Sequence, residues 1–176
     1  MTLPGADSLG RIRLILTDVD GVLTDGRIHF DASGHESKSF HVHDAAGLIY
    51  WHRSGGLSGF LSGRDAPIVR ARAAEIGVHE VHLGHLDKLP VFEAITERLG
   101  LADDEVAYVG DDLLDLPVLR RVGLAAAPAD ARPEVRSTVH HVTGAGGGTG
   151  VLREIVELLL RARGAWDEVV RKGGRP

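Results

Sequence analysis

Two aspartates separated by one residue, Asp18 and Asp20, stand at the end of a short apolar run over residues 12–17. An extended backbone turns side chains two positions apart to the same side, where two carboxylates repel each other unless a positive charge neutralises them. Asp111 stands in the same way after a second apolar run, residues 106–109. Converging carboxylate oxygens are the ligands that Mg²⁺ prefers, with waters and a phosphate group completing its octahedron. Asp18, Asp20 and Asp111 therefore predict a magnesium site.

Two further loops supply a hydroxyl group and a positive charge. Ser62 follows the apolar run 57–61, and Lys88 lies in the loop after the run 79–83. A cation, a lysine, a hydroxyl and a free carboxylate match phosphoryl transfer, where catalysis consists mostly of positioning and charge neutralisation around an in-line displacement. Each residue alone is common as a turn, a helix cap or a solvated side chain. The prediction of phosphoryl transfer therefore depends on their joint placement.

The elements that must position these residues alternate along the chain. Strands are predicted at 12–17, 57–61, 79–83, 106–109, 123–126 and 138–142, and helices at 44–53, 65–76, 87–99, 113–121 and 151–163. This rhythm is typical of an α/β fold, and ligands of an open parallel sheet bind outside the carboxyl ends of its strands. Alternating segments at 27–30 and 36–40 predict a β-hairpin, at about 27–40, that projects from the body. We expect a Rossmann-like three-layer sandwich with a mostly parallel sheet.

Composition limits the possible functions. The chain has 176 residues, a formal net charge of -5 and no cysteine, which excludes disulfides, thiolate zinc sites and a cysteine nucleophile. No cluster of basic residues indicates binding to nucleic acid or to membrane phosphates. No apolar run reaches the length of about 18 residues that spans a membrane, and residues 1–9 lack the features of a secretory signal. We expect a single domain over residues 1–176, located in the cytoplasm.

The residues described so far resemble, in order, the four motifs of the haloacid dehalogenase superfamily. The matching segments are residues 18–26, 61–64, 88 and 109–115. The resemblance implies that Asp18 is the nucleophile that becomes an aspartyl phosphate, and that Asp20 is the acid and base. It implies that Ser62 and Lys88 hold the phosphoryl oxygens. It also implies that Asp18, Asp111 and the backbone carbonyl of Asp20 bind Mg²⁺.

Two more consequences follow from this resemblance. Asp112 and Asp115 are expected to orient the metal ligands or Lys88 rather than to bind the ion. Superfamily members often carry a cap domain, but only 44 positions separate Asp18 from Ser62 and only 26 separate Ser62 from Lys88. The predicted hairpin, helices and strands use all of them, so we expect no cap domain. An uncapped site accepts a macromolecule or is closed by a neighbouring subunit.

Further features resemble the 3-deoxy-D-manno-octulosonate 8-phosphate phosphatase group. These are the Asp-Val-Asp-Gly-Val start, the hairpin, and the late segment Gly-Gly-Gly-Thr-Gly-Val-Leu-Arg-Glu. The resemblance implies Mg²⁺-dependent removal of phosphate from a small phosphorylated sugar acid during lipopolysaccharide biosynthesis. It also implies a ring-like homotetramer in which hairpins and C-terminal tails help to close neighbouring sites. The predicted tail, at about 164–176, is rich in glycine, and we expect it to be flexible.

Substrate contacts are predicted for Ser62, Gly63, Arg64, Lys88 and His43. The arginine at position 64 resembles the octulosonate enzymes, whereas related phosphatases for nine-carbon sugar acids commonly have Glu there. An arginine side chain also suits a bidentate contact to a carboxylate. His43 stands where the group usually has Arg, so it either keeps a hydrogen bond to the ligand or marks a different substrate.

Other interpretations remain at this point. A nine-carbon keto-sugar-acid 9-phosphate is the alternative substrate. A non-enzymatic phospho-acceptor domain would share the sheet, the acidic cluster, the hydroxyl and the lysine, but would carry its acceptor on a middle strand. The spacing of His79, His82 and His85 disfavours a zinc site. The glycine-rich residues 144–150 follow the last predicted strand, which favours a helix entry capped by Thr149 over a nucleotide loop.

Overall fold

Six parallel strands form the central sheet of the computed structural model, which describes residues 1–175. The strands are β1 (Leu14–Thr17), β4 (Leu57–Ser62), β5 (Glu80–Leu83), β6 (Val106–Val109), β7 (Leu124–Ala127) and β8 (His141–Val142). They lie in the order β5-β4-β1-β6-β7-β8, and every neighbouring pair is parallel. Each strand falls at a position that the sequence predicts, with shifts of a few residues at the ends.

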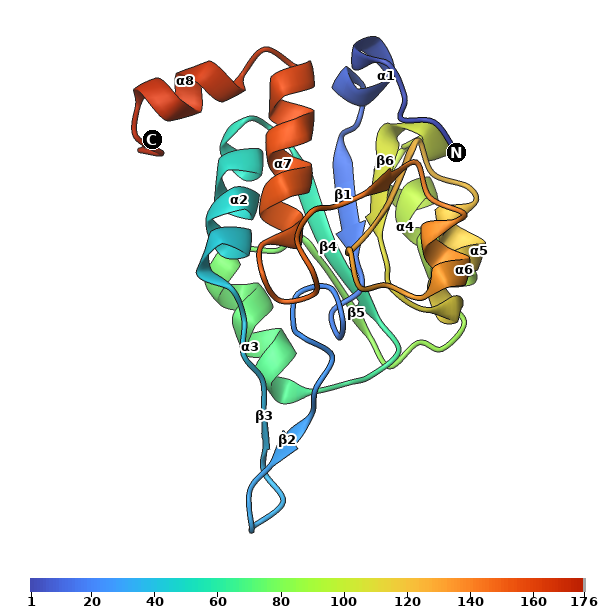
Figure 1. Cartoon of the computed structure of the whole chain (residues 1–176), viewed down its shortest axis with the longest axis vertical. Coiled ribbons are helices and arrows are strands. Elements are labelled where there is room, and N and C mark those ends of the chain that lie inside the picture. Colours follow the sequence, from blue (N-terminus) through green and yellow to red (C-terminus); the bar gives the residue numbers. More distant parts are fainter. Residues whose placement is uncertain (176) are drawn as a thin grey trace.

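Helices cover both faces of this sheet (Figure 1). They are α1 (Ala6–Gly10), α2 (Val42–Arg53), α3 (Pro67–Ile76), α4 (Leu89–Leu99), α5 (Leu116–Leu119), α6 (Pro133–Arg136), α7 (Val151–Ala162) and α8 (Trp166–Arg171). Helices α2, α3 and α7 bury their apolar residues against one face, and α4, α5 and α6 against the other. The predicted Rossmann-like three-layer sandwich is confirmed, and no cap domain interrupts it between residues 1 and 175.

The strands are apolar on both sides because both sides are covered. In β1, Ile15 faces the core under α2 and α7, while Leu14 and Leu16 face the core under α4 and α5. Strand β6 alternates in the same way, with Val109 on the first side and Tyr108 on the second. A sheet that is buried on both faces leaves only its strand ends open, so the polar loops gather there.

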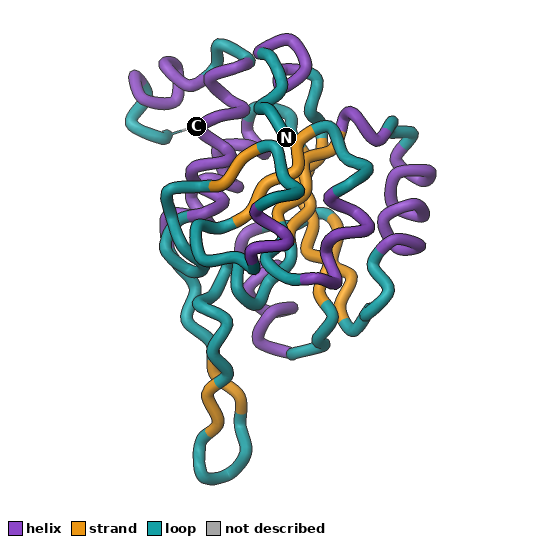
Figure 2. Tube along the Cα trace, turned by 45° about the vertical axis from the view of Figure 1, so that its right-hand side comes forward, coloured by secondary structure: helices purple, strands orange, loops and turns teal. Residues whose placement is uncertain are grey.

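The predicted hairpin is present and projects beyond the carboxyl ends of the strands (Figures 1 and 2). Its strands β2 (His29–Phe30) and β3 (Glu36–Ser37) pair antiparallel. Asp31 Oδ1 accepts the backbone N–H groups of Ser33 at 2.8 Å and His35 at 2.9 Å, which closes the turn. Regular pairing covers only the tip, and the rest of the arm is extended chain.

The C-terminal segment contains a helix where the sequence analysis expects a flexible tail, so that expectation is wrong for α8. Trp166 is buried, and its ring centre lies 5.1 Å from the guanidinium group of Arg153 and 5.4 Å from that of Arg161. Arg53 Nη1 donates to the carbonyl of Gly174 at 2.5 Å. These contacts attach the segment to α2 and α7, at the end of the molecule opposite the hairpin (Figure 1). Residue 176 of the predicted tail lies outside the described residues.

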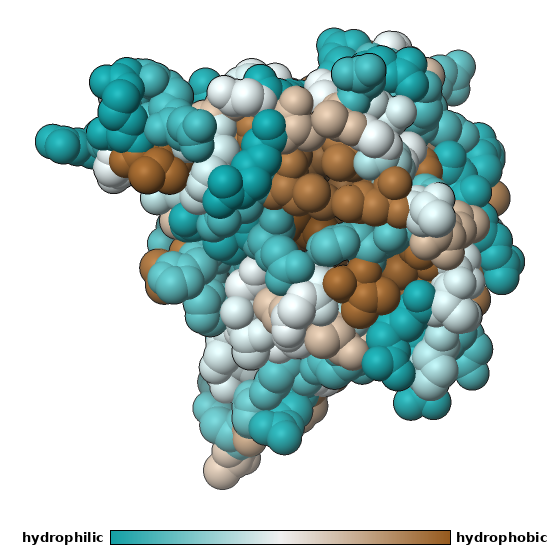
Figure 3. Space-filling model, turned by 45° about the horizontal axis from the view of Figure 1, so that its top comes forward, coloured by the Kyte–Doolittle hydropathy of each residue, from teal (hydrophilic) through white to brown (hydrophobic). Residues whose placement is uncertain are grey.

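Polar side chains cover most of α8 in the space-filling view, and an apolar area is exposed nearer the centre of the same face (Figure 3). The apolar stripe of α7 is not part of the surface. Its residues Leu152, Ile155, Val156, Leu159 and Leu160 are all buried in the core of this chain. Within residues 1–175, no helix is both long enough and apolar enough to cross a membrane.

Candidate active site

Four loops meet in one cavity of about 310 Å³ at the carboxyl end of the sheet. Seven predicted residues line it, namely Asp18, Asp20, Ser62, Gly63, Arg64, Lys88 and Asp111. Two larger hollows, of about 420 and 460 Å³, lie beneath α8 and beside α3. Each has only one carboxylate among its lining side chains. The smaller cavity is therefore the place where the chemistry-bearing residues converge.

Lys88 is the central positive charge of this cavity. Its side chain is almost completely buried just before α4. The ammonium nitrogen lies 2.6 Å from Asp115 Oδ1 and 3.1 Å from Asp18 Oδ2. Burial alone would lower the pKa of Lys88, but Asp18 and Asp115 outweigh this effect and raise it. Lys88 is therefore a fixed cation beside the predicted nucleophile.

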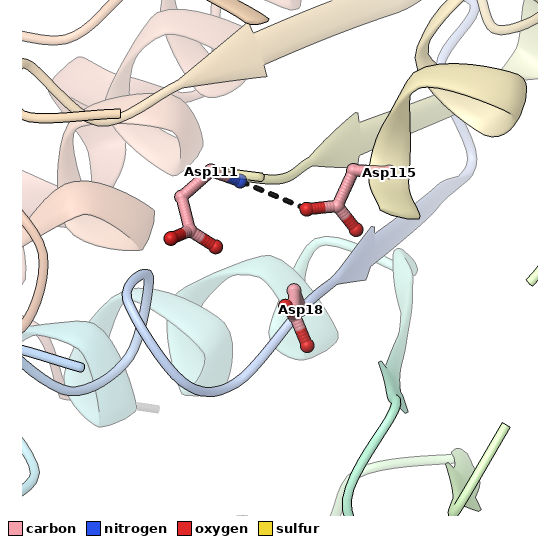
Figure 4. Close-up of side chains that lie close together, drawn as sticks. All are labelled: Asp18, Asp111 and Asp115. Carbon is pink, nitrogen blue, oxygen red and sulfur yellow. Dashed lines mark hydrogen bonds between the residues drawn. The ribbon is translucent and has the colours of Figure 1, made fainter. Parts of the chain in front are cut away.

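Asp115 holds both Lys88 and the loop that carries Asp111. Its Oδ2 accepts the backbone N–H group of Asp111 at 2.9 Å (Figure 4). The same oxygen accepts the backbone N–H group of Asp112 at 3.1 Å. A Cβ atom on Gly110 would lie 2.4 Å from the Asp115 side chain, so only glycine fits at that position. The contacts of Asp115 match the predicted role of orienting its neighbours.

The carboxylates of Asp18, Asp111 and Asp115 converge, with oxygen atoms within 4.8 Å of one another. Asp115 is already engaged by its hydrogen-bond donors, which leaves Asp18 and Asp111 as the pair able to bind an ion (Figure 4). Asp111 Oδ1 is buried and has no hydrogen-bond partner among the described residues. A hard divalent cation such as Mg²⁺ fits this donor set.

The electrostatics of the cavity also indicate a site for a cation. Burial raises the pKa of Asp111 to about 8, and Asp18, Asp115 and Asp112 add to the shift. Burial, followed by the charge of Asp115, raises the pKa of Asp18 to about 7, although Lys88 acts against this. One lysine therefore does not neutralise the carboxylates, and a bound cation would supply the missing positive charge.

A second charged cluster surrounds Asp20 at the base of the hairpin. Lys38 Nζ lies 2.5 Å from Asp20 Oδ1 and 2.9 Å from Glu36 Oε1, and the Lys38 side chain is fully buried. Arg64 approaches Asp20 Oδ2 at 3.7 Å and Glu36 Oε2 at 3.1 Å. Sequence reasoning missed Lys38 and Glu36. Their period-two spacing on the hairpin arm, which puts both on one side of the strand, was the available signal.

His43 does not line the cavity of its own chain. It lies exposed on the first turn of α2, and its backbone N–H donates to His41 Nδ1 at 3.3 Å. The two rings lie 4.8 Å apart. The structure therefore brings every predicted contact residue except His43 to this cavity.

The glycine-rich residues 144–150 brace the segment that follows Asp20. Gly148 donates to the carbonyl of Val22 at 2.9 Å, and a Cβ atom on Gly147 would lie 2.2 Å from the carbonyl oxygen of Gly21. The predicted cap at Thr149 is wrong. Its hydroxyl donates to the carbonyl of Gly146 at 2.7 Å, and Gly150 precedes α7 without a side-chain cap.

Comparisons with known proteins agree with this site. The family model of haloacid dehalogenase-like hydrolases matches residues 65–155. The 3-deoxy-D-manno-octulosonate 8-phosphate phosphatase of Escherichia coli K12 is 43% identical over 157 residues, which cover 89% of this chain and 84% of that protein. The chain therefore belongs to the haloacid dehalogenase-like hydrolase family, and the resemblance found in the sequence is confirmed.

Solved structures of two such phosphatases are also similar. The enzyme from Moraxella catarrhalis, in complex with magnesium, phosphate and 3-deoxy-D-manno-octulosonate, is 33% identical with a TM-score of 0.93, covering 96% of this chain and 97% of that one. The cobalt-bound enzyme from Haemophilus influenzae is 39% identical with a TM-score of 0.90, covering 95% and 98%. Both relatives hold a divalent metal ion.

The position of Gly21 gives a test of the metal site. A Cβ atom there would lie 2.1 Å from Asp111 Oδ2, so Gly21→Ala should displace that carboxylate. We expect the Mg²⁺ concentration that gives half of the metal-induced rise in melting temperature to increase about tenfold or more.

Gly34→Ala is the matched control, because Gly34 has a similar positive φ of 84° but no atom within 4 Å of its Cβ position. If Gly21→Ala folds and needs the same Mg²⁺ concentration as the wild type for half of the rise in melting temperature, Asp111 does not bind the ion.

Proposed function

We propose that this chain is a Mg²⁺-dependent phosphomonoesterase acting on a small phosphorylated sugar acid, with 3-deoxy-D-manno-octulosonate 8-phosphate as the favoured substrate. The observation that carries the reaction type is the placement of Lys88 between Asp18 and Asp115, in the cavity that also contains Asp20 and Ser62. The relatives named above support the substrate, because they are phosphatases of that sugar phosphate.

Asp18 is the proposed nucleophile. Its Oδ1 accepts the backbone N–H of Val19 at 2.7 Å and its Oδ2 faces Lys88, so the carboxylate is held in one orientation. An Asp18 oxygen bonds to phosphorus while the bond from phosphorus to the sugar oxygen breaks, which leaves an aspartyl phosphate. Mg²⁺, held by Asp18, Asp111 and the backbone carbonyl of Asp20, would neutralise negative charge on the phosphoryl oxygens.

Asp20 moves the proton in both halves of the reaction. It gives a proton to the departing sugar alkoxide, and then takes one from the water that attacks phosphorus and releases Asp18. Ser62 and Lys88 hold phosphoryl oxygens. The Ser62 hydroxyl oxygen accepts the backbone N–H of Arg64 at 3.2 Å, which leaves its hydrogen available to a phosphoryl oxygen.

Arg64 is the proposed contact for the sugar-acid carboxylate. It lines the cavity, and its side chain is 46% exposed, so the guanidinium group can reach a bound ligand. A guanidinium group binds a carboxylate through two parallel hydrogen bonds. Gly63 lies beside it in the cavity wall, and His43, which does not line the cavity of its own chain, would contact the substrate only from a neighbouring subunit.

A substrate panel tests the proposal. We expect kcat/KM for the octulosonate 8-phosphate to exceed that for a nine-carbon keto-sugar-acid 9-phosphate and for para-nitrophenyl phosphate by about tenfold or more. A higher value for the nine-carbon substrate would support the alternative phosphatase. A single stoichiometric phosphorylation without steady release of phosphate would support the phospho-acceptor domain.

Two conservative variants separate the roles of the first two aspartates. Asp18→Asn should abolish turnover, because an amide neither attacks phosphorus nor anchors the cation. Asp20→Asn should reduce kcat by about 100-fold or more through lost proton transfer, yet keep Mg²⁺ affinity, because its proposed metal contact is a backbone carbonyl. Calorimetric titration with Mg²⁺ and steady-state kinetics check both. Equal loss of metal binding in Asp20→Asn and Asp111→Asn would contradict this division.

A homotetramer is the proposed assembly. The projecting hairpin exposes Phe30, and the cavity rim exposes Leu86 and Leu114, so a neighbouring hairpin would cover apolar surface at the site. Light scattering should give about four times the chain mass of 18.8 kDa, and a monomer would refute the assembly. A tail beside a neighbouring site, the cytoplasmic location and the role in lipopolysaccharide biosynthesis stay predictions.

A further inference from the structure

Tyr108 carries a polar group into the apolar core under α4 and α5. It lies on β6, is fully buried, and belongs to the hydrophobic cluster that includes Leu16 and Phe92. A buried hydroxyl is costly unless it finds a hydrogen-bond partner. The Tyr108 hydroxyl donates to Asp115 Oδ1 at 2.7 Å, so this phenol reaches from the core to the edge of the active site.

The same oxygen of Asp115 accepts a hydrogen bond from Lys88 Nζ at 2.6 Å. Its other oxygen takes the backbone N–H groups of Asp111 and Asp112. A carboxylate offers about four lone-pair sites, so these four donors saturate Asp115. Burial, together with the charges of Asp115 and Asp18, raises the pKa of Tyr108, so its hydroxyl stays a donor.

Lys88 has three ammonium hydrogens to distribute. One points to Asp115, and Asp18 Oδ2 lies 3.1 Å from the nitrogen. Because Tyr108 occupies the remaining position on Asp115 Oδ1, Asp115 cannot take a second hydrogen from Lys88. The ammonium group is therefore left with hydrogens for Asp18 and for a phosphoryl oxygen in the cavity.

We propose that Tyr108 is a positioning residue for the phosphoryl-transfer step, acting through Asp115 to keep Lys88 directed at Asp18 and at the phosphoryl group. The inference rests on the proposed function. Tyr108 never contacts the substrate. It shares Asp115 Oδ1 with Lys88, whereas the loop carrying Asp111 is held by Oδ2. Its influence should therefore fall on Lys88 and spare the metal site.

Tyr108→Phe tests this division, because it keeps the buried ring and removes only the donor. We expect kcat for para-nitrophenyl phosphate to fall about tenfold, the size typical of losing one hydrogen bond to a charged group. The inhibition constant of inorganic phosphate should rise severalfold, while the Mg²⁺ concentration for half-maximal activity should stay within about twofold of wild type.

The chain offers a matched control in its other tyrosine, Tyr50. Tyr50 lies on α2 and lines the hollow beneath α8, away from the cavity that contains Lys88, so Tyr50→Phe should leave all three constants unchanged. An Asp115→Ala background adds a second control, because alanine removes both oxygen acceptors, whereas an amide would keep one for the Tyr108 hydroxyl. Once the carboxylate is gone, Tyr108→Phe should lower kcat by less than about twofold, since coupled residues are not additive.

Each outcome decides a separate question. If the wild-type protein turns over substrate and Tyr108→Phe has the same kcat, the positioning role is overturned, even if the melting temperature of the variant falls. A full tenfold loss in the Asp115→Ala background would overturn it too, because the effect would not pass through Asp115. Absence of wild-type turnover with every phosphomonoester would overturn the proposed function and this inference with it.

Discussion

Lys88 forms salt bridges to two carboxylates, Asp18 and Asp115, and these contacts fix the geometry of the whole site. Lys88 Nζ lies 3.1 Å from Asp18 Oδ2 and 2.6 Å from Asp115 Oδ1, and both Lys88 and Asp115 are buried. Removing such charges from water costs several kcal/mol per ion unless each finds partners. Asp115 finds four hydrogen-bond donors. Burial raises the pKa values of Asp18 and Asp111, and the neighbouring carboxylates, which one lysine does not balance, raise them further. The same excess of negative charge that makes the site costly makes it a metal site.

The order of the strands in the sheet brings these charges together. Strand β1 lies between β4 and β6, so the loops carrying Asp18, Ser62 and Asp111 leave adjacent strand ends. Glycines allow the final approach, because a side chain on Gly110 would meet Asp115 and one on Gly21 would meet Asp111. The hairpin then adds Lys38 above Asp20, which gives the proposed acid and base a cationic neighbour.

Sequence patterns predicted the features of the protein that depend on local periodicity. Apolar runs located all six strands, and the aspartates after them located the cavity, because parallel strands end at one edge. Contacts between distant segments were not predictable in that way. Lys38 meets Asp20 only through the path of the hairpin, α8 forms because Trp166 finds Arg153 and Arg161, and the Thr149 hydroxyl takes a nearby carbonyl instead of capping α7.

A crystal structure with Mg²⁺ and beryllium trifluoride, which mimics a phosphoryl group on a carboxylate, would test the separate roles of Asp18, Asp111 and Asp115. We expect beryllium to be bonded to an Asp18 oxygen and Mg²⁺ to be bound by Asp18 and Asp111. Asp115 should remain on Lys88 and Tyr108, as it is here. Mg²⁺ bound by Asp115, or beryllium fluoride on any carboxylate other than Asp18, would contradict these roles.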